Sequence, residues 1–263
     1  MTFDNISAEE ASMLEPRRRN LRPSEVRQVE RIKESVSPRE FEERLKRSLK
    51  RDGQLLARET AKRIEKASTE WKQKVGRTFG EATTDDPRIL ERVARLKTKA
   101  GLHKTSVIFH GDLGVGKSWN SYGYINLAIL AGAVTPGQII ADTETAILGK
   151  ISSSGFKRAE LLEELFNPRY KIYFIDDVGQ GYFSNDQGRT EVWYELVDHV
   201  YTHQLTLIMT TNKKLTDMSL GSWIGARAYD RLKALVGQDG AIVPGVVNRR
   251  AGVLEKAEQN YRS

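Results

Sequence analysis

The chain has 263 residues, 39% of them hydrophobic, which suffices for one large domain or for a medium domain with an appended region. No apolar run reaches about 18 residues, which excludes a membrane-spanning helix. The N-terminus lacks the basic-then-apolar layout of a secretion signal. Cysteine is absent, which excludes disulfides and thiolate metal sites and is the usage expected of a cytoplasmic protein.

The net charge of +7 comes entirely from the first part of the chain. Residues 1–100 hold 25 Lys and Arg against 18 Asp and Glu, whereas the remaining residues hold 17 of each sign. Such an asymmetry favours a region that meets nucleic acid or an acidic partner. A solvated helix surface is the plainer alternative.

Residues 1–78 are predicted to form a small, basic helical region. Ser37, Pro38 and Glu40 give a helix start, since Ser caps the helix, Pro fits its first position and Glu completes a capping box. Helical propensity continues to about residue 75 with a break expected at 52–53. Three residues spaced four apart form one narrow apolar stripe: Phe41, Leu45 and Leu49. The stripe favours a partner-binding domain; a self-contained bundle and direct DNA binding are the alternatives.

Residues 79–263 are predicted to form an α/β domain after a linker at 76–86. Short apolar runs predict strands at 105–110, 138–142, 171–175, 205–209 and 241–243. Helices are expected at 87–100, 119–131, 143–167 (with a break at 152–155), 188–202 and 222–235. This alternation predicts a parallel sheet flanked by helices, with the ligand beyond the carboxyl ends of the strands.

The strongest functional signal is residues 111–118, which read Gly-Asp-Leu-Gly-Val-Gly-Lys-Ser between a strand and a helix. That is the context of a phosphate-binding loop, or P-loop, in which glycines let backbone N–H groups approach phosphate oxygens. Lys117 is expected to reach the β- and γ-phosphates, and the Ser118 hydroxyl to help hold Mg²⁺. The expected nucleotide contacts are Gly111, Asp112, Gly114, Val115, Gly116, Lys117, Ser118 and Trp119.

Polar residues also end the third and fourth predicted strands. Asp176 is expected to hold Mg²⁺ with Ser118, and Asp177 to orient or deprotonate the attacking water. Asn212 could sit between the γ-phosphate and that water, or act as a turn residue after the strand. All these positions lie at the carboxyl edge of the predicted sheet.

Arg227 and Arg231 are four residues apart on one predicted helix face. A guanidinium can stabilise charge on a transferred phosphoryl group, and one that comes from a neighbouring subunit makes hydrolysis depend on assembly. A solvated pair, or an ion pair with a nearby carboxylate, is the alternative.

With these residues assembled, positions 79–263 resemble the AAA+ ATPase domain of DnaC-like helicase loaders and IstB-like transposition ATPases. The resemblance rests on residues 111–118 as Walker A, 175–179 as Walker B, 211–212 as sensor 1, and 225–232. The terminal Asn-Tyr-Arg at 260–262 looks like the family's Ser-Tyr-Arg.

The resemblance implies that Arg231 is the arginine finger, Arg227 an accessory residue and Arg262 sensor 2, although Arg249 or Arg250 could take that last role. One departure is Asp177, where the family usually has Glu, which bears on the hydrolysis rate more than on ATP binding.

Two functions follow from the likeness. The first is an ATP- and Mg²⁺-dependent loader whose residues 1–78 bind a DnaB-like replicative helicase and whose ATPase domains form a homo-oligomer, a spiral or ring, on single-stranded DNA. Lys157 and Arg158 beside Phe156 are its DNA-contact candidates, with a plain surface loop as the alternative. The second is an IstB-like ATPase that assembles on duplex DNA and recruits a transposase.

Overall fold

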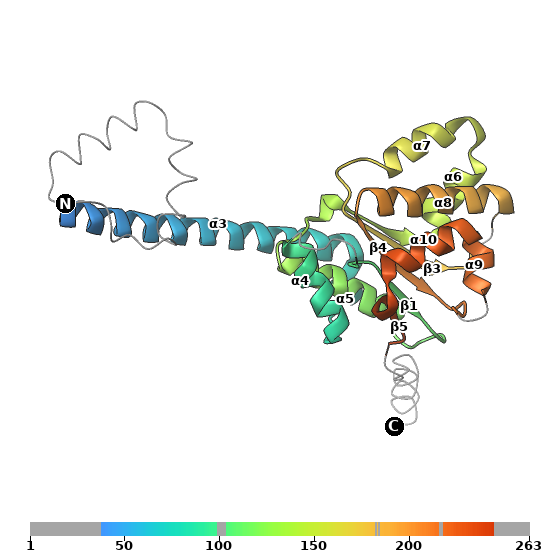
Figure 1. Cartoon of the computed structure of the whole chain (residues 1–263), viewed down its shortest axis with the longest axis horizontal. Coiled ribbons are helices and arrows are strands. Elements are labelled where there is room, and N and C mark those ends of the chain that lie inside the picture. The colour runs from blue at the N-terminus through green and yellow to red at the C-terminus, as the bar shows by residue number, and fades with distance from the viewer. Residues whose placement is uncertain (1–37, 99–103, 182, 184, 216–217, 245–263) are drawn as a thin grey trace, which may run out of the picture. The chain divides into compact units, whose positions relative to one another are not determined.

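The computed structural model describes residues 38–98, 104–181, 183, 185–215 and 218–244 (Figure 1). The chain divides into two compact units, residues 1–60 and 61–263. No helix within the described ranges is long and apolar enough to cross a membrane.

The first described element is helix α3 (Pro38–Gly80), which begins at the predicted start. The break predicted at 52–53 is wrong, because the helix runs through both positions. A single glycine costs a helix only about 1 kcal/mol, and strong helix formers surround this one. The backbone leaves helical geometry at Gly76 (φ 78°, ψ 170°), yet the helix resumes, so the linker spans 81–86 and not 76–86.

Two predictions about the N-terminal region stay predictions. The side chains of the apolar stripe at 41, 45 and 49 lie outside what the structure describes. The domain boundary at 78/79 likewise remains an expectation. In the first unit, Leu55 and Leu56 are exposed on α3.

A five-stranded parallel sheet forms the centre of the second unit. Its strands are β1 (Val107–His110), β2 (Ile139–Thr143), β3 (Ile172–Val178), β4 (Thr206–Thr211) and β5 (Ala241–Ile242). They lie in the order β2-β3-β4-β1-β5, and every neighbouring pair is parallel. The predicted fold class, an α/β parallel sheet flanked by helices, is confirmed.

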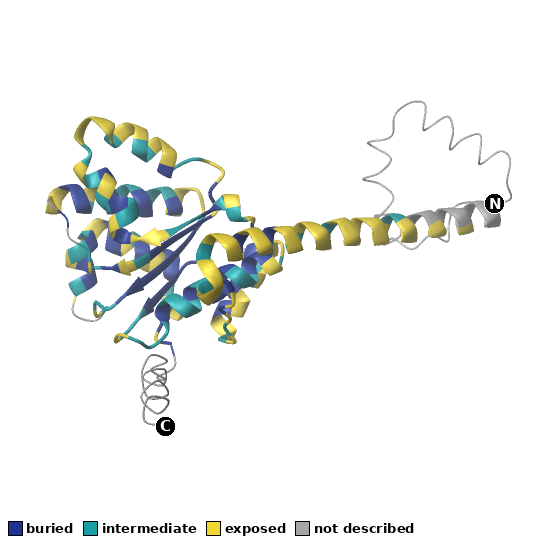
Figure 2. Cartoon of the chain, turned by 180° about the vertical axis from the view of Figure 1, so that it is seen from behind, coloured by how far each residue is buried: buried dark blue, intermediate teal, exposed yellow. Residues whose placement is uncertain are grey.

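Alternate strand side chains build two cores, one on each face of the sheet. Phe109 and Phe174 join one core with helices α4 (Pro87–Thr98) and α5 (Lys117–Leu130). Ile108, Tyr173 and Ile175 join the other with α8 (Asp186–Thr202) and α10 (Ala226–Val236). Because both faces are covered, the centres of the strands are apolar, and Figure 2 shows most of the sheet as buried.

Shorter helical pieces complete the second unit. They are η1 (Pro136–Gln138), the π-helix η2 (Thr145–Gly149), α6 (Lys150–Ser153), η3 (Gly155–Lys157), α7 (Arg158–Leu165), α9 (Ser219–Ile224) and η4 (Gln238–Gly240). The interrupted helical stretch predicted at 143–167 is confirmed. The single helix predicted at 222–235 is in fact two, because Gly225 (φ 89°, ψ 143°) separates α9 from α10.

Asn126 on α5 fastens the end of α3 and the linker to the domain. Its amide nitrogen donates to the carbonyls of Phe79 (3.0 Å) and Ala82 (2.8 Å), and its oxygen accepts the indole N–H of Trp71 (2.8 Å). Trp71 is only 1% exposed, so its N–H depends on this acceptor.

Replacing Asn126 with leucine should therefore destabilise the protein. The substitution leaves a buried indole N–H and several carbonyls without partners, which costs roughly 2–3 kcal/mol. Urea unfolding of the full chain measures the loss. Gln73→Leu, at an exposed amide on α3, is the matched control and should shift stability by less than about 0.5 kcal/mol. Equal stabilities for the two variants would contradict this role of Asn126.

Candidate nucleotide-binding site

The P-loop follows β1 and leads directly into α5, as predicted. Gly111 (φ 123°), Gly114 (φ 83°) and Gly116 (φ 88°) all adopt positive φ. Only glycine takes such angles without strain, which is the physical reason for glycine at these three positions of the loop. The loop therefore bends back over the N-terminus of α5, where helix N–H groups and the helix dipole favour an anion.

Lys117 closes this loop. Its Nζ donates to the carbonyls of Gly111 (2.8 Å) and Asp112 (2.7 Å), and the residue is 7% exposed. Burial lowers the pKa of the neighbouring His110, and the Lys117 cation lowers it further. A cation thus lies at the mouth of the P-loop, where Lys117 was predicted to meet phosphate.

The hydroxyl of Ser118 meets the carboxylate of Asp176. Ser118 Oγ donates to Asp176 Oδ1 over 3.0 Å, joining the first turn of α5 to β3. Burial raises the pKa of Asp176; the Thr210 hydroxyl opposes that rise, the Asp177 carboxylate adds to it, and Ser118 opposes it. The two predicted Mg²⁺ ligands are therefore adjacent in the folded chain.

The Thr210 hydroxyl of β4 forms hydrogen bonds with both residues of the acidic pair, Asp176 and Asp177. It donates to Asp176 Oδ1 and accepts the backbone N–H of Asp177 (2.9 Å). The register of β3 against β4 shifts between Ile175 and Val178, and Asp177 takes a left-handed backbone (φ 55°). This irregularity turns Asp177 outward, where it is exposed.

Asn212 lies at the same edge of the sheet. It follows Thr211, which pairs with His110 of β1, directly before the P-loop. The Oδ1 atom of Asn212 is buried and has no hydrogen-bond partner among the described residues. A buried polar atom in that condition calls for a water or a ligand.

The two predicted arginines lie on α10. Arg227 is exposed. Arg231 forms an ion pair with Asp198 of α8, and its guanidinium carbon lies 5.0 Å from the centre of the Tyr194 ring. Within one chain Arg231 is thus held against α8, and both arginine roles stay predictions.

The remaining predicted site residues lie outside the described ranges or beside the P-loop. Arg249, Arg250 and Arg262 lie outside the described residues. The indole N–H of Trp119 donates to the carbonyl of Thr83 in the linker (3.0 Å). Two valines border Gly111, since a Cβ there would lie 3.4 Å from Val243 and 3.7 Å from Val115.

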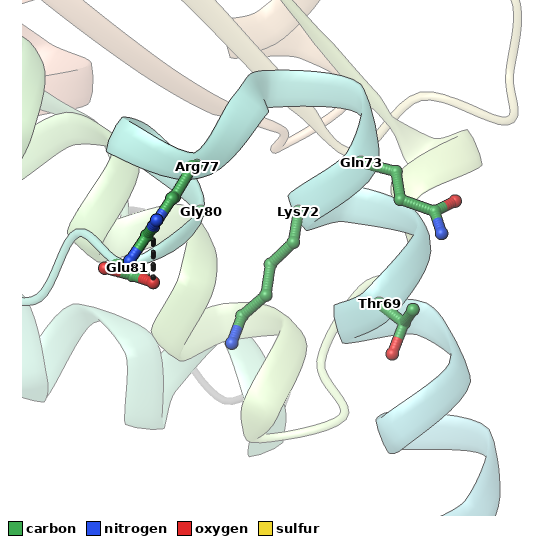
Figure 3. Close-up of a pocket in the computed structure, with 6 residues that line it drawn as sticks. All are labelled: Thr69, Lys72, Gln73, Arg77, Gly80 and Glu81. Atoms are coloured by element: carbon green, nitrogen blue, oxygen red, sulfur yellow. Dashed lines mark ion pairs between the residues drawn. The ribbon is translucent and has the colours of Figure 1, made fainter.

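A separate shallow hollow lies on the last turns of α3. Figure 3 shows its lining, with an ion pair between Arg77 and Glu81 (3.7 Å) and with Lys72 beside it. None of its lining residues belongs to the P-loop or to the strand ends that carry the acidic pair and Asn212. It is therefore not part of the nucleotide site.

Motif reading missed two residues that the structure places at this edge, Thr210 and Glu144. Thr210 lies in β4, a fully buried strand that also holds Thr206 and Thr211, so its hydroxyl was not singled out by the pattern. Glu144 directly follows β2 and is 1% exposed. The sequence signal available for Glu144 was a charged residue at the carboxyl end of a strand, but no motif fixes the spacing of such a residue from the P-loop.

No family model and no curated protein sequence matches the chain. Among solved structures it is similar to the DnaC helicase loader (16% identity, TM-score 0.49), covering 65% of this chain and 100% of that one. It is similar to DnaI (17%, TM-score 0.49; 65% and 94% covered) and to domain III of the Thermotoga maritima replication initiation protein DnaA (15%, TM-score 0.45; 70% and 74% covered).

The parallel strand order and the P-loop between β1 and α5 define a P-loop α/β fold. The P-loop, Asp176 and Asn212 lie at the carboxyl ends of three adjacent strands, β1, β3 and β4, at one edge of the sheet.

Thr210→Val should destabilise the domain although it keeps the side-chain shape. It removes the hydroxyl that serves both Asp176 and the backbone N–H of Asp177, which leaves a part-buried N–H without this acceptor and costs roughly 1–2 kcal/mol. Chemical denaturation measures the change. Thr202→Val, at an exposed threonine at the end of α8, is the control and should be close to neutral. A neutral Thr210→Val would refute the bracing role.

Proposed function

We propose that this chain binds ATP with Mg²⁺ at the P-loop edge of its sheet and hydrolyses the terminal phosphate. One observation carries the proposal: Ser118 Oγ and Asp176 Oδ1 lie 3.0 Å apart beside a closed P-loop. A hydroxyl from the P-loop and a strand-end carboxylate are the pair that holds Mg²⁺ in P-loop ATPases.

The residues present fit a magnesium–nucleotide complex. Mg²⁺ prefers oxygen ligands and usually takes only one or two carboxylates from a protein, since waters and substrate phosphates complete its shell. Within the described ranges no group of three His, Cys, Asp or Glu side chains could hold a metal alone. Ser118 and Asp176 would hold the ion, which supplies charge neutralisation to the phosphates when bound.

The other site residues take roles around that complex. Lys117 would exchange the carbonyls of Gly111 and Asp112 for phosphate oxygens. Asp177, exposed beside the buried Asp176, would orient the attacking water. The buried Oδ1 of Asn212 would accept a hydrogen bond from that water. We propose that Arg231, with Arg227 nearby, acts on the ATP of an adjacent subunit once assembly draws it from Asp198.

Lys117→Ala should abolish turnover and weaken ATP binding by at least about tenfold, because it removes the charge that faces the phosphates. Binding of a fluorescent ATP analogue and steady-state phosphate release measure the two effects. Lys72→Ala, on α3 (Figure 3), removes an exposed lysine elsewhere and is the matched control. Unchanged turnover in Lys117→Ala would refute the site.

We infer that the ATPase acts as a replicative helicase loader that assembles on single-stranded DNA. The resemblance of four sequence elements to that family supports this, as does the basic excess of residues 1–100. Phe156 on η3 is fully exposed and Lys157 beside it is exposed too, which suits base stacking next to a phosphate contact. Arg158 is the weaker candidate, because it pairs with Glu195 (2.9 Å).

Binding of the full chain to DNA and to helicase tests this role. With a non-hydrolysable ATP analogue, Phe156→Ala should weaken single-strand binding at least about fivefold, since a stacked base is worth roughly 1–3 kcal/mol. Leu130→Ala, at an exposed leucine that ends α5, is the control. The chain should also co-elute with the host replicative helicase. Salt-sensitive preference for duplex DNA without helicase binding would overturn the loader and favour the transposition-type ATPase.

A further inference from the structure

Glu144 is a buried carboxylate on which three segments of the domain converge. It directly follows β2, precedes the π-helix η2 and is 1% exposed. Its Oε2 accepts the backbone N–H of Gly179 (2.8 Å), and its Oε1 accepts the indole N–H groups of Trp193 and Trp223 (2.7 Å each). These donors come from the loop after β3, from α8 and from α9.

Burial raises the pKa of the Glu144 carboxyl above its ordinary value, and its three N–H donors and Arg189 oppose that rise. Arg189 is itself buried, and its Nε donates to the carbonyl of Trp223 (2.9 Å). Three N–H donors offset the cost of burying this carboxylate and hold it in one position, so it can act as a fixed anchor.

Trp223 extends this anchor to the sensor 1 strand. The guanidinium carbon of Arg189 lies 3.9 Å from the centre of its ring, and Nζ of Lys213 lies 4.6 Å from it. Each contact is a cation–π attraction. Lys213 directly follows Asn212, so the end of β4 is held above the same indole that Glu144 binds.

The loops that carry Asp177 and Asn212 also touch each other. Gly179 lies two residues after Asp177 with φ 89°, and a Cβ there would lie 2.2 Å from Cε of Lys213. Gly181 is just as close to η2, since its Cβ would lie 2.4 Å from Oγ1 of Thr145. The positive φ of Gly179 favours glycine there, and a Cβ at either position would displace a neighbouring side chain.

We propose that Glu144 is a positioning residue for hydrolysis, which with Trp223 clamps the loops of Asp177 and Asn212 in their working places. The inference rests on the proposed ATPase function. The hydrogen bonds and cation–π contacts described above for Glu144 and Trp223 do not involve the P-loop residues 111–118, so the clamp should govern the chemical step and leave ATP binding to Lys117 and its loop.

Glu144→Gln tests the clamp with little change of shape. The amide oxygen can still accept both indoles, but its NH₂ group then faces the N–H of Gly179, donor against donor. Misplacing catalytic groups by about 1 Å can cost 100-fold, so we expect kcat to fall at least about tenfold. The Kd of an ATP analogue should stay within about threefold, because the P-loop is untouched.

A measurement on the nucleotide-free protein tests separately whether Glu144 holds the loop that contains Gly179. Amide hydrogen exchange of the peptide 176–181 should accelerate in Glu144→Gln, because Gly179 loses its acceptor. Trp223→Phe keeps a ring beside the two cations but loses the N–H donor, and should show a smaller loss of kcat in the same direction. The Trp223→Phe variant keeps the proposal testable if Glu144→Gln fails to fold.

Glu195→Gln is the matched control. It makes the same substitution on α8 at a carboxylate that pairs with Arg158 at the surface, and should leave kcat and exchange unchanged.

Three results would overturn the clamp: wild-type kcat in both test variants, unchanged exchange at 176–181, or an ATP affinity that falls as much as kcat. A wild-type chain that binds ATP without hydrolysing it would instead overturn the proposed function, whereas accelerated exchange in Glu144→Gln would still support the anchoring of the loop.

Discussion

The hydrogen bond from Ser118 to Asp176 is the contact on which the site depends. It joins the first turn of α5 to the end of β3, two elements that meet only because β3 and β1 flank β4 in one parallel sheet. The same carboxylate also accepts the Thr210 hydroxyl of β4. One helix and two strands, α5, β3 and β4, thereby contribute to one polar cluster, and a shift in any of them would separate its members.

Support for this cluster comes from two sides of the sheet. On one side, Asn126 and Trp119 of α5 hold the linker and the end of α3 against the helix that begins at the P-loop. On the other side, Glu144 and Trp223 brace the loops after β3 and β4. The parts proposed to bind phosphate and the parts proposed to activate water therefore rest on different helices, so the two roles can be perturbed separately.

Much of this could be predicted, because the signals are local. The P-loop sequence fixes its own turn through positive-φ glycines, and apolar runs that end in polar residues predicted β3, β4 and the placement of Asp176 and Asn212. The failures were also local. A glycine at 53 favoured a break that strong neighbouring helix formers override, and the pattern at 222–235 concealed the bend at Gly225.

By itself, then, the sequence determined the elements, the parallel sheet and the edge at which polar residues gather, since hydrophobic runs and loop chemistry act over a few residues. Only the tertiary structure decided which side chains meet there. Glu144 contacts partners 35, 49 and 79 residues away along the chain, and Thr210 reaches back 34 residues to Asp176. No spacing rule encodes such contacts, because they join segments that become neighbours only when the strands pair and helices α8 and α9 pack against the sheet.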